Sequence, residues 1–112
     1  MTRMARFVNI AALTLLLALI GCQPDHKPFD SNAWIVGDYR ERGRMSDDLL
    51  NQHPLEGRTV AELEKLLGEP NDTDTSLSIK TWYLDLGWTA LFHMDVHIDT
   101  TTAVVDSVRV WD

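Results

Sequence analysis

An apolar run near the N-terminus determines how much of the chain is left to form a folded domain. Arg3 and Arg6 precede the run Phe7–Ile20, which two polar residues interrupt, and the small residue Gly21 follows it. A basic start, a short apolar segment and a small residue are typical of a secretory signal. A membrane-spanning helix needs about 18 apolar residues or more, and this run is shorter. We therefore expect a cleaved signal peptide over residues 1–21.

The single cysteine of the chain gives this signal a specific ending. Cys22 closes the sequence Leu-Ile-Gly-Cys at residues 19–22, which resembles the lipobox of bacterial lipoproteins. The resemblance implies cleavage between Gly21 and Cys22 and acylation, for example with palmitate, of the cysteine. Residues 22–33 would then be the lipidated cysteine and a tether. Each buried methylene adds about 0.8 kcal/mol of membrane affinity, so several acyl chains hold a protein stably. The alternative is an unmodified cysteine after an ordinary signal.

Two further features bear on location and partners. Gln23 stands where inner-membrane lipoproteins of enteric bacteria usually have aspartate, so the lipobox resemblance implies the outer membrane, with the domain facing the periplasm. The formal net charge is -7, and such a field repels phosphate backbones. We therefore expect no nucleic-acid partner. The expected partners are the membrane, through the lipid anchor, and proteins of the envelope, including the outer-membrane assembly machinery.

The clearest local signal in the rest of the chain is a capped helix. Thr59 and Glu62 form a capping box, and Gly68 supplies the C-terminal cap. The apolar residues between them recur on one helical face, namely Val60, Leu63, Leu66 and Leu67. A shorter helix is expected before it, with Ser46 as its N-cap and Pro54 beyond its end.

Three strand-like runs follow a polar, turn-prone stretch at 71–76: roughly 78–86, 89–98 and 103–110. Their short connections favour antiparallel hairpins, because parallel pairing needs a long crossover. Hydrophobic residues make up 45% of the chain and charged residues 24%, which suits a globular domain. The sequence therefore predicts an α+β domain over 34–112, with two short helices packed on a three-stranded antiparallel sheet, an ααβββ two-layer sandwich.

One strand carries residues that could ligate a metal. His93, Asp95 and His97 alternate, so their side chains share a face of the sheet. Two imidazoles and a carboxylate can bind zinc or a similar divalent ion. The alternative, which we favour, is the solvated face of an antiparallel sheet whose other face is apolar. We expect no metal and no other cofactor. No nucleophile with a base beside it is indicated, so we do not expect an enzyme.

Partner contacts are the remaining candidate sites. Arg40, Arg42 and Arg44 form a basic cluster in an acidic chain, and they could meet an acidic partner or a phosphate. The favoured interpretation is that they pair with the acidic residues nearby, which are Asp38, Glu41, Asp47 and Asp48. Trp82 and Trp88 would contact a partner if they are exposed on the sheet, and would otherwise pack against the helices.

The order of these signals resembles the SmpA/OmlA (BamE-like) domain, the fold of the small lipoprotein of the outer-membrane protein assembly machine. The likeness covers about residues 44–112 and rests on the lipobox and on these motifs: Met45 with Asp48-Leu49, Leu55-x-Gly57-x-Thr59-x-x-Glu62, Leu66-Leu67-Gly68-Glu69-Pro70, and Trp82-Tyr83-Leu84. The resemblance implies a two-helix, three-strand sandwich that has no catalytic activity and works by protein contact at the inner leaflet of the outer membrane.

These observations predict a periplasm-facing lipoprotein that acts as a protein-interaction module, accessory to outer-membrane protein assembly or envelope integrity. The functional part of this prediction rests on the resemblance to the SmpA/OmlA fold. Two alternatives stay open. One is a periplasmic inhibitor or sensor that docks one specific partner. The other is a divalent-metal-binding lipoprotein that uses His93, Asp95 and His97.

Overall fold

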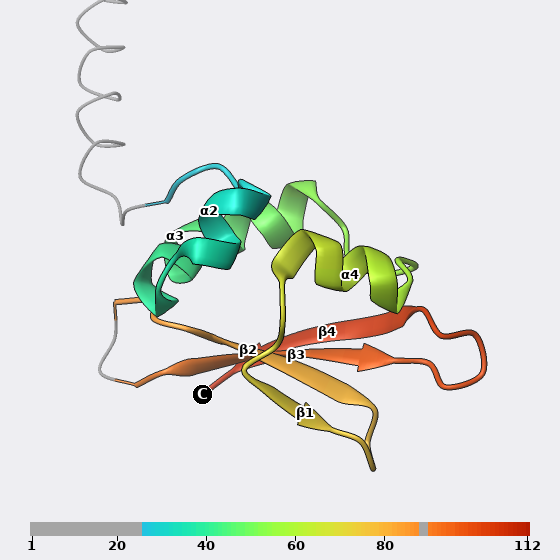
Figure 1. Cartoon of the computed structure of the whole chain (residues 1–112). Coiled ribbons are helices and arrows are strands. Elements are labelled where there is room, and N and C mark those ends of the chain that lie inside the picture. Colours follow the sequence, from blue (N-terminus) through green and yellow to red (C-terminus); the bar gives the residue numbers. More distant parts are fainter. Residues whose placement is uncertain (1–25, 88–89) are drawn as a thin grey trace, which may run out of the picture.

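Helices cover one face of an antiparallel sheet in the computed structural model (Figure 1). The structure describes residues 26–87 and 90–112. The expected signal peptide, the lipidation site at Cys22 and the candidate contact Trp88 lie outside these residues. The described elements are α2 (Ser31–Val36), α3 (Tyr39–Gln52), α4 (Val60–Leu67), β1 (Asp72–Asp74), β2 (Ile79–Leu84), β3 (Phe92–Ile98) and β4 (Val105–Trp111). The α+β class is confirmed.

The sheet has the order β1-β2-β3-β4, and all three pairings are antiparallel. The three predicted strand regions and their antiparallel pairing are therefore confirmed. The prediction of only three strands is wrong, because β1 forms within the stretch expected to be a turn. All three side chains of β1 are exposed, so this strand exists through backbone pairing with β2, and no apolar alternation announces it.

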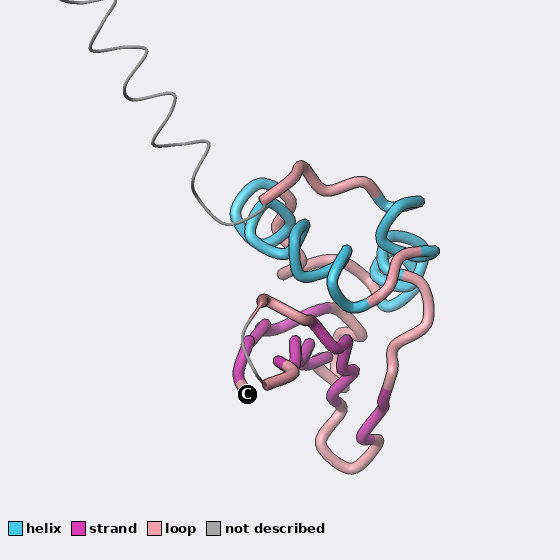
Figure 2. Tube along the Cα trace, turned by 90° about the vertical axis from the view of Figure 1, so that its left-hand side faces the viewer, coloured by secondary structure: helices cyan, strands magenta, loops and turns pink. Residues whose placement is uncertain are grey.

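The core lies between the two layers, and Figure 2 shows the helices gathered on one side of the strands. The helices and the sheet both contribute side chains with no solvent exposure. Those from the helices are Trp34, Met45, Leu49, Leu63 and Leu67, and those from the sheet are Trp82, Leu84, Met94 and Val96. Burial of side chains of this size stabilises by about 1.5 to 3 kcal/mol each. Within the described part of the chain, no helix is long and apolar enough to cross a membrane.

The predicted boundaries of α4 are confirmed. The Thr59 hydroxyl accepts a hydrogen bond from the backbone N–H of Glu62 at 3.2 Å. Gly68 follows the last helical residue with φ of 72° and ψ of -165°, a conformation that is essentially restricted to glycine. The carboxylate of Glu62 accepts from the Thr59 hydroxyl and completes the local network.

The prediction of two helices, with the first beginning at Ser46, is wrong. Helix α3 begins at Tyr39, and the carboxylate of Asp38 caps it by accepting from the backbone N–H of Glu41 at 2.9 Å. Ser46 lies inside α3, where its hydroxyl donates to the Gly43 carbonyl at 2.8 Å. The additional helix α2 begins at Ser31, within the range expected as a tether.

Candidate functional site

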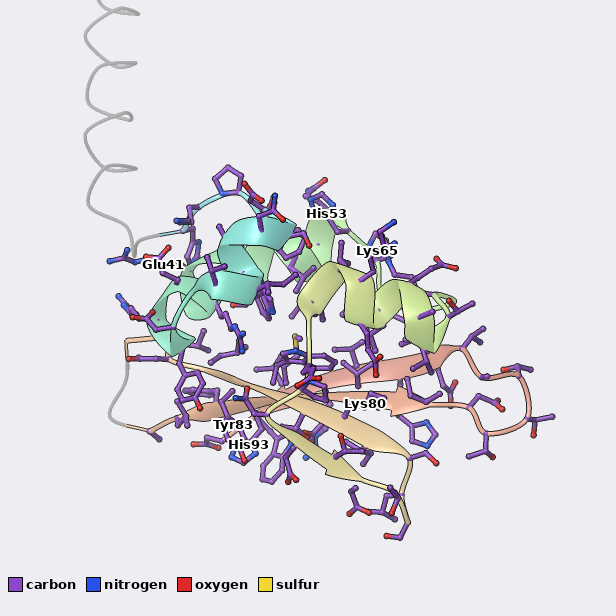
Figure 3. The ribbon with its side chains drawn as sticks, in the orientation of Figure 1. Glu41, His53, Lys65, Lys80, Tyr83 and His93 are labelled. Carbon is purple, nitrogen blue, oxygen red and sulfur yellow. The ribbon has the colours of Figure 1, made fainter. Side chains whose placement is uncertain are left out.

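The sheet has one face that the helices leave uncovered, which we call the outer face. Tyr83, His93 and Trp111 are paired across β2, β3 and β4 and share this face. Their neighbours in the strands, Trp82 and Met94, point into the core instead. Figure 3 shows Tyr83 and His93 on the side of the sheet away from the helices. The strand predicted at roughly 89–98 is therefore confirmed as β3, which is shorter at its start and has one apolar and one solvated face.

Four aromatic side chains form a row across this outer face. The ring centroids of Tyr39 and Tyr83 are 5.8 Å apart, those of Tyr83 and His93 are 5.0 Å apart, and those of His93 and Trp111 are 4.9 Å apart. These are contact distances for aromatic pairs. Tyr39, at the start of α3, is 39% exposed, and Trp111, at the end of β4, is 41% exposed. The ring row consists of these four residues and is accessible at both ends.

A carboxylate fixes one end of the ring row. Asp95 accepts a hydrogen bond from the Thr81 hydroxyl at 2.6 Å and another from the Trp111 indole N–H at 2.5 Å. The guanidinium of Arg109 lies 5.8 Å from the Trp111 ring centroid, within the range of a cation–π contact. The indole is therefore held in place by an acid at its edge and a cation over its face.

His93, Asp95 and His97 share the outer face, as their spacing predicts, but each has a different neighbour. His93 lies between two rings, and Asp95 binds Thr81 and Trp111. His97 Nδ1 lies 3.2 Å from Asp106 Oδ2. Across the ranges 26–87 and 90–112, no three histidine, cysteine or acidic residues are grouped to hold a metal ion. The arrangement is that of the solvated face of a sheet, in which each of the three residues contacts a different neighbour.

The arginine cluster is dispersed by helix α3. Arg42 is only 9% exposed, and its Nε donates to the Trp34 carbonyl at 2.9 Å. Burial lowers the pKa of this guanidinium from its ordinary value. The hypothesis that Arg42 contacts a partner is therefore wrong, because this side chain ties α2 to α3. Arg44 donates to Glu41 at 2.8 Å, as local pairing predicts, and Arg40 lies 4.0 Å from Asp85.

Trp82 is also unavailable to a partner. Its side chain has no solvent exposure, and its indole N–H donates to the Leu67 carbonyl at 3.2 Å. The hypothesis of Trp82 as an exposed contact is therefore wrong, and the alternative of packing against the helices is confirmed. Strand alternation already predicts that Trp82 and Tyr83 face opposite sides of the sheet, so only one of them can pack in the core.

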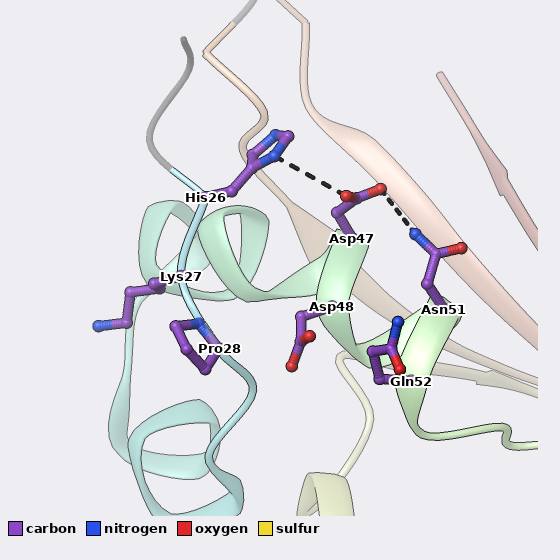
Figure 4. Close-up of a pocket in the computed structure, with 7 residues that line it drawn as sticks. All are labelled: His26, Lys27, Pro28, Asp47, Asp48, Asn51 and Gln52. Carbon is purple, nitrogen blue, oxygen red and sulfur yellow. Dashed lines mark hydrogen bonds and ion pairs between the residues drawn. The ribbon is translucent and has the colours of Figure 1, made fainter. Parts of the chain in front are cut away.

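A concave region lies on the helix layer, where the described chain enters the domain (Figure 4). It has a volume of about 260 Å³ and is lined by His26, Lys27, Pro28, Asp47, Asp48, Asn51 and Gln52. Asp47 Oδ1 accepts from Asn51 at 3.2 Å, and His26 Nδ1 lies 3.8 Å from Asp47 Oδ2. The Asp47–Asn51 contact lies within α3, and the His26 contact brings the start of the described chain alongside this helix.

The chain has no match to a family model, and none among curated proteins or solved structures. The resemblance to the SmpA/OmlA domain stays a prediction.

Proposed function

We propose that this protein is an outer-membrane lipoprotein whose periplasmic domain is a protein-interaction module without enzymatic activity. The lipobox at residues 19–22 supports the anchor. The observation that best supports the interaction role is the place at which the described chain enters the domain. The described chain begins on the helix layer, and the outer face with its ring row lies on the opposite side of the domain.

The segment after His26 is firmly attached to helix α3. The backbone N–H of Lys27 donates to the Arg44 carbonyl at 3.0 Å, and its ammonium donates to Glu41 at 2.6 Å. The backbone N–H of Phe29 donates to Asp48 at 2.8 Å. The point where the described chain enters the domain is therefore fixed on the helix layer.

A lipid on Cys22 would place this entry point close to the bilayer. Only four Cα-to-Cα steps separate Cys22 from His26, and an extended chain covers at most about 14 Å in four steps. The helix layer would then lie toward the membrane and the outer face toward the periplasm. Such an orientation presents the ring row to proteins, or parts of proteins, that lie in the periplasm, and keeps it clear of lipid.

The resemblance to the SmpA/OmlA domain supports a role as an accessory to outer-membrane protein assembly or envelope integrity. An inhibitor or sensor of one specific partner would use the same outer face. Photo-crosslinking in intact cells separates the two. A photoreactive residue at Trp111 should give adducts with barrel-assembly components, whereas the same residue at Asn51 on the helix layer should not. Adducts with a single unrelated soluble enzyme would contradict the assembly role.

The anchor is tested by labelling cells with palmitate and separating their membranes. The wild-type chain should incorporate the label and fractionate with the outer membrane, and Cys22→Ser should do neither. Gln23→Asp is the matched variant, because it keeps the acylated cysteine and should move the protein to the inner membrane. A wild-type chain that takes up no label, or a Cys22→Ser chain that fractionates as wild type does, would overturn the proposal.

A further inference from the structure

The geometry of the outer face points to a defined kind of partner. We infer that it binds a cationic protein segment, whose arginine side chains stack on the ring row and donate hydrogen bonds to Asp95. This inference rests on the proposed function only for the statement that the partner is a protein. It identifies the surface and the chemistry by which that partner is recognised.

The charge of the outer face favours a cation. By strand register, the carboxylates of Asp72, Asp74 and Asp95 lie on this face, and Asp106 joins them through its contact with His97. Among the described strand residues that point outward, Arg109 is the one cation. Lys80 points to the helix layer, where its ammonium lies 3.4 Å from Glu64. The face therefore attracts cationic side chains and repels anionic ones.

The ring row favours guanidinium among cations. A planar guanidinium stacks on aromatic faces and is more weakly hydrated than an ammonium ion, so it loses less on leaving water. The chain already contains one such contact, because Arg109 lies over Trp111 at 5.8 Å. Tyr39, at the other end of the row, is 39% exposed. A second guanidinium can therefore reach the tyrosine side of the row.

Asp95 supplies the hydrogen-bonding partner for such a group. Each of its two carboxylate oxygens accepts one bond within the protein, and an ionised carboxylate offers about four acceptor positions. The Asp95 carboxylate can therefore accept further hydrogen bonds from a planar guanidinium that lies beside the ring row. Charge-assisted bonds of this type are about twice as strong as those between neutral groups.

Other occupants fit the outer face less well. A bilayer of anionic lipid would be repelled by the carboxylates of this face. A second copy of this chain would bring one acidic face against another, in a protein of net charge -7. Like charges across an interface disfavour association. A cationic protein segment satisfies both the acids and the rings.

The test is a titration of the full-length chain, labelled with nitrogen-15 in zwitterionic detergent micelles. The probe is the peptide Gly-Arg-Gly-Arg-Gly, and the control peptide carries neutral citrulline in place of both arginines. The arginine peptide should shift the indole N–H signal of Trp111 and the backbone amides of His93 and Asp95. It should bind at least about fivefold more tightly than the citrulline peptide, because only arginine carries the charge.

Variants locate the binding. Asp95→Asn should weaken binding of the arginine peptide about fivefold or more, through loss of the charged acceptor, while His97→Gln on the same strand should bind as wild type does. The buried Trp82 indole signal reports whether each variant is folded. If Asp95→Asn does not fold, Asp72→Asn, which removes a carboxylate from the face without touching Trp111, should weaken binding and reduce its salt dependence.

Four outcomes would overturn the inference: shifts confined to the Asp47 and Asp48 side of α3, equal binding of the citrulline peptide, wild-type affinity in Asp95→Asn, or concentration-dependent shifts without peptide. The last would indicate self-association. The measurement does not depend on acylation, so Cys22→Ser should bind the peptide as wild type does. A missing palmitate label would overturn the anchor alone, and missing peptide binding would overturn this inference alone.

Discussion

Gly43 in helix α3 lies directly against the backbone of Asp85, in the segment that follows β2. A Cβ added to Gly43 would stand 1.9 Å from the Asp85 carbonyl oxygen, well inside any allowed contact. One turn earlier, the Tyr39 carbonyl accepts from the backbone N–H of Asp85 at 2.9 Å. The absence of a side chain at Gly43 is therefore what allows the helix layer and the sheet to approach at this end of the domain.

Gly43→Ala should destabilise the protein, although the same change inside an exposed helix usually stabilises by about 0.8 to 1 kcal/mol. The added methyl group must displace backbone, and overpacking of this kind costs about 1 to 3 kcal/mol or more. Urea unfolding followed by circular dichroism measures the change. The exposed Gln52→Ala in the same helix is the control, with an expected effect within about 0.5 kcal/mol. A Gly43→Ala variant as stable as wild type would show that α3 does not approach Asp85 in this way.

Gly68→Val should lower the free energy of unfolding by about 1 kcal/mol or more, because Gly68 has a positive φ that a β-branched residue avoids. A Cβ there would also lie 3.2 Å from Ile35. Gly57 separates backbone strain from steric contact. Its φ is also positive, at 87°, but a Cβ added to it would meet no neighbouring atom within 4 Å. Thermal unfolding should show Gly68→Ala to be more damaging than Gly57→Ala. Equal effects would leave backbone strain as the sole cause.

Leu67→Ala should destabilise by about 2 to 5 kcal/mol, the range for truncating a buried leucine. Leu67 has no solvent exposure and lies in the core, whereas Leu66, beside it in α4, is only partly buried. Leu66→Ala should therefore cost clearly less, and the pair is a matched test of which face of α4 is covered. Chemical denaturation of both variants measures the difference. A larger loss at Leu66 would contradict the orientation of the helix.

The pKa of Glu41 should lie below its ordinary value of 4.5, chiefly because the Lys27 ammonium donates a hydrogen bond to its carboxylate. A lowered folded-state pKa contributes stability above the unfolded-state pKa, and that contribution is lost as the pH falls through the folded-state value. The Lys27–Glu41 contact should therefore weaken as the pH falls through the folded-state pKa of Glu41. Carbon-13 detection of the side-chain carboxyl measures the pKa directly.

Lys27→Gln is the variant that tests this cause, because it removes the cation and keeps a polar side chain. The pKa of Glu41 should rise toward its ordinary value in this variant, while the Arg44 contact keeps part of the lowering. Glu41→Gln identifies the signal by removing it. An unchanged Glu41 pKa in Lys27→Gln would show that the two side chains are not paired in solution.

The elements that sequence reasoning located correctly are those with local signals. Thr59 and Gly68 mark the ends of α4 through chemistry within a few residues, and the alternation along 92–98 fixes which side chains are buried. Strand β1 has no comparable signal, because it forms through backbone pairing with β2. The start of α3 does have one, since Asp38 caps the helix through the backbone N–H of Glu41 with the same spacing as Thr59 and Glu62. Gly43 weakens that signal, because glycine is a poor helix former, and its place in α3 depends on the distant Asp85.

The candidate site also combines features that local sequence signals predict with features that they do not. The shared face of His93, Asp95 and His97 follows from strand alternation, but their neighbours come from other strands. The stack of His93 between Tyr83 and Trp111 depends on the register of two hairpins, and hairpin register is set by turn geometry as well as by burial. Tyr39 reaches the ring row only because α3 begins at that residue. The spacing of residues along the sequence predicts neither the stack of His93 nor the position of Tyr39.

The edges of the sheet also affect how this protein behaves among its own copies. The edge strand β1 has three residues and two carboxylates, and β4, the other edge, has an irregularity in its pairing with β3 opposite His97 and Ile98. Short, charged or bulged edges resist the addition of further strands. Many copies crowded on a two-dimensional surface would therefore resist joining edge to edge into continuous sheets.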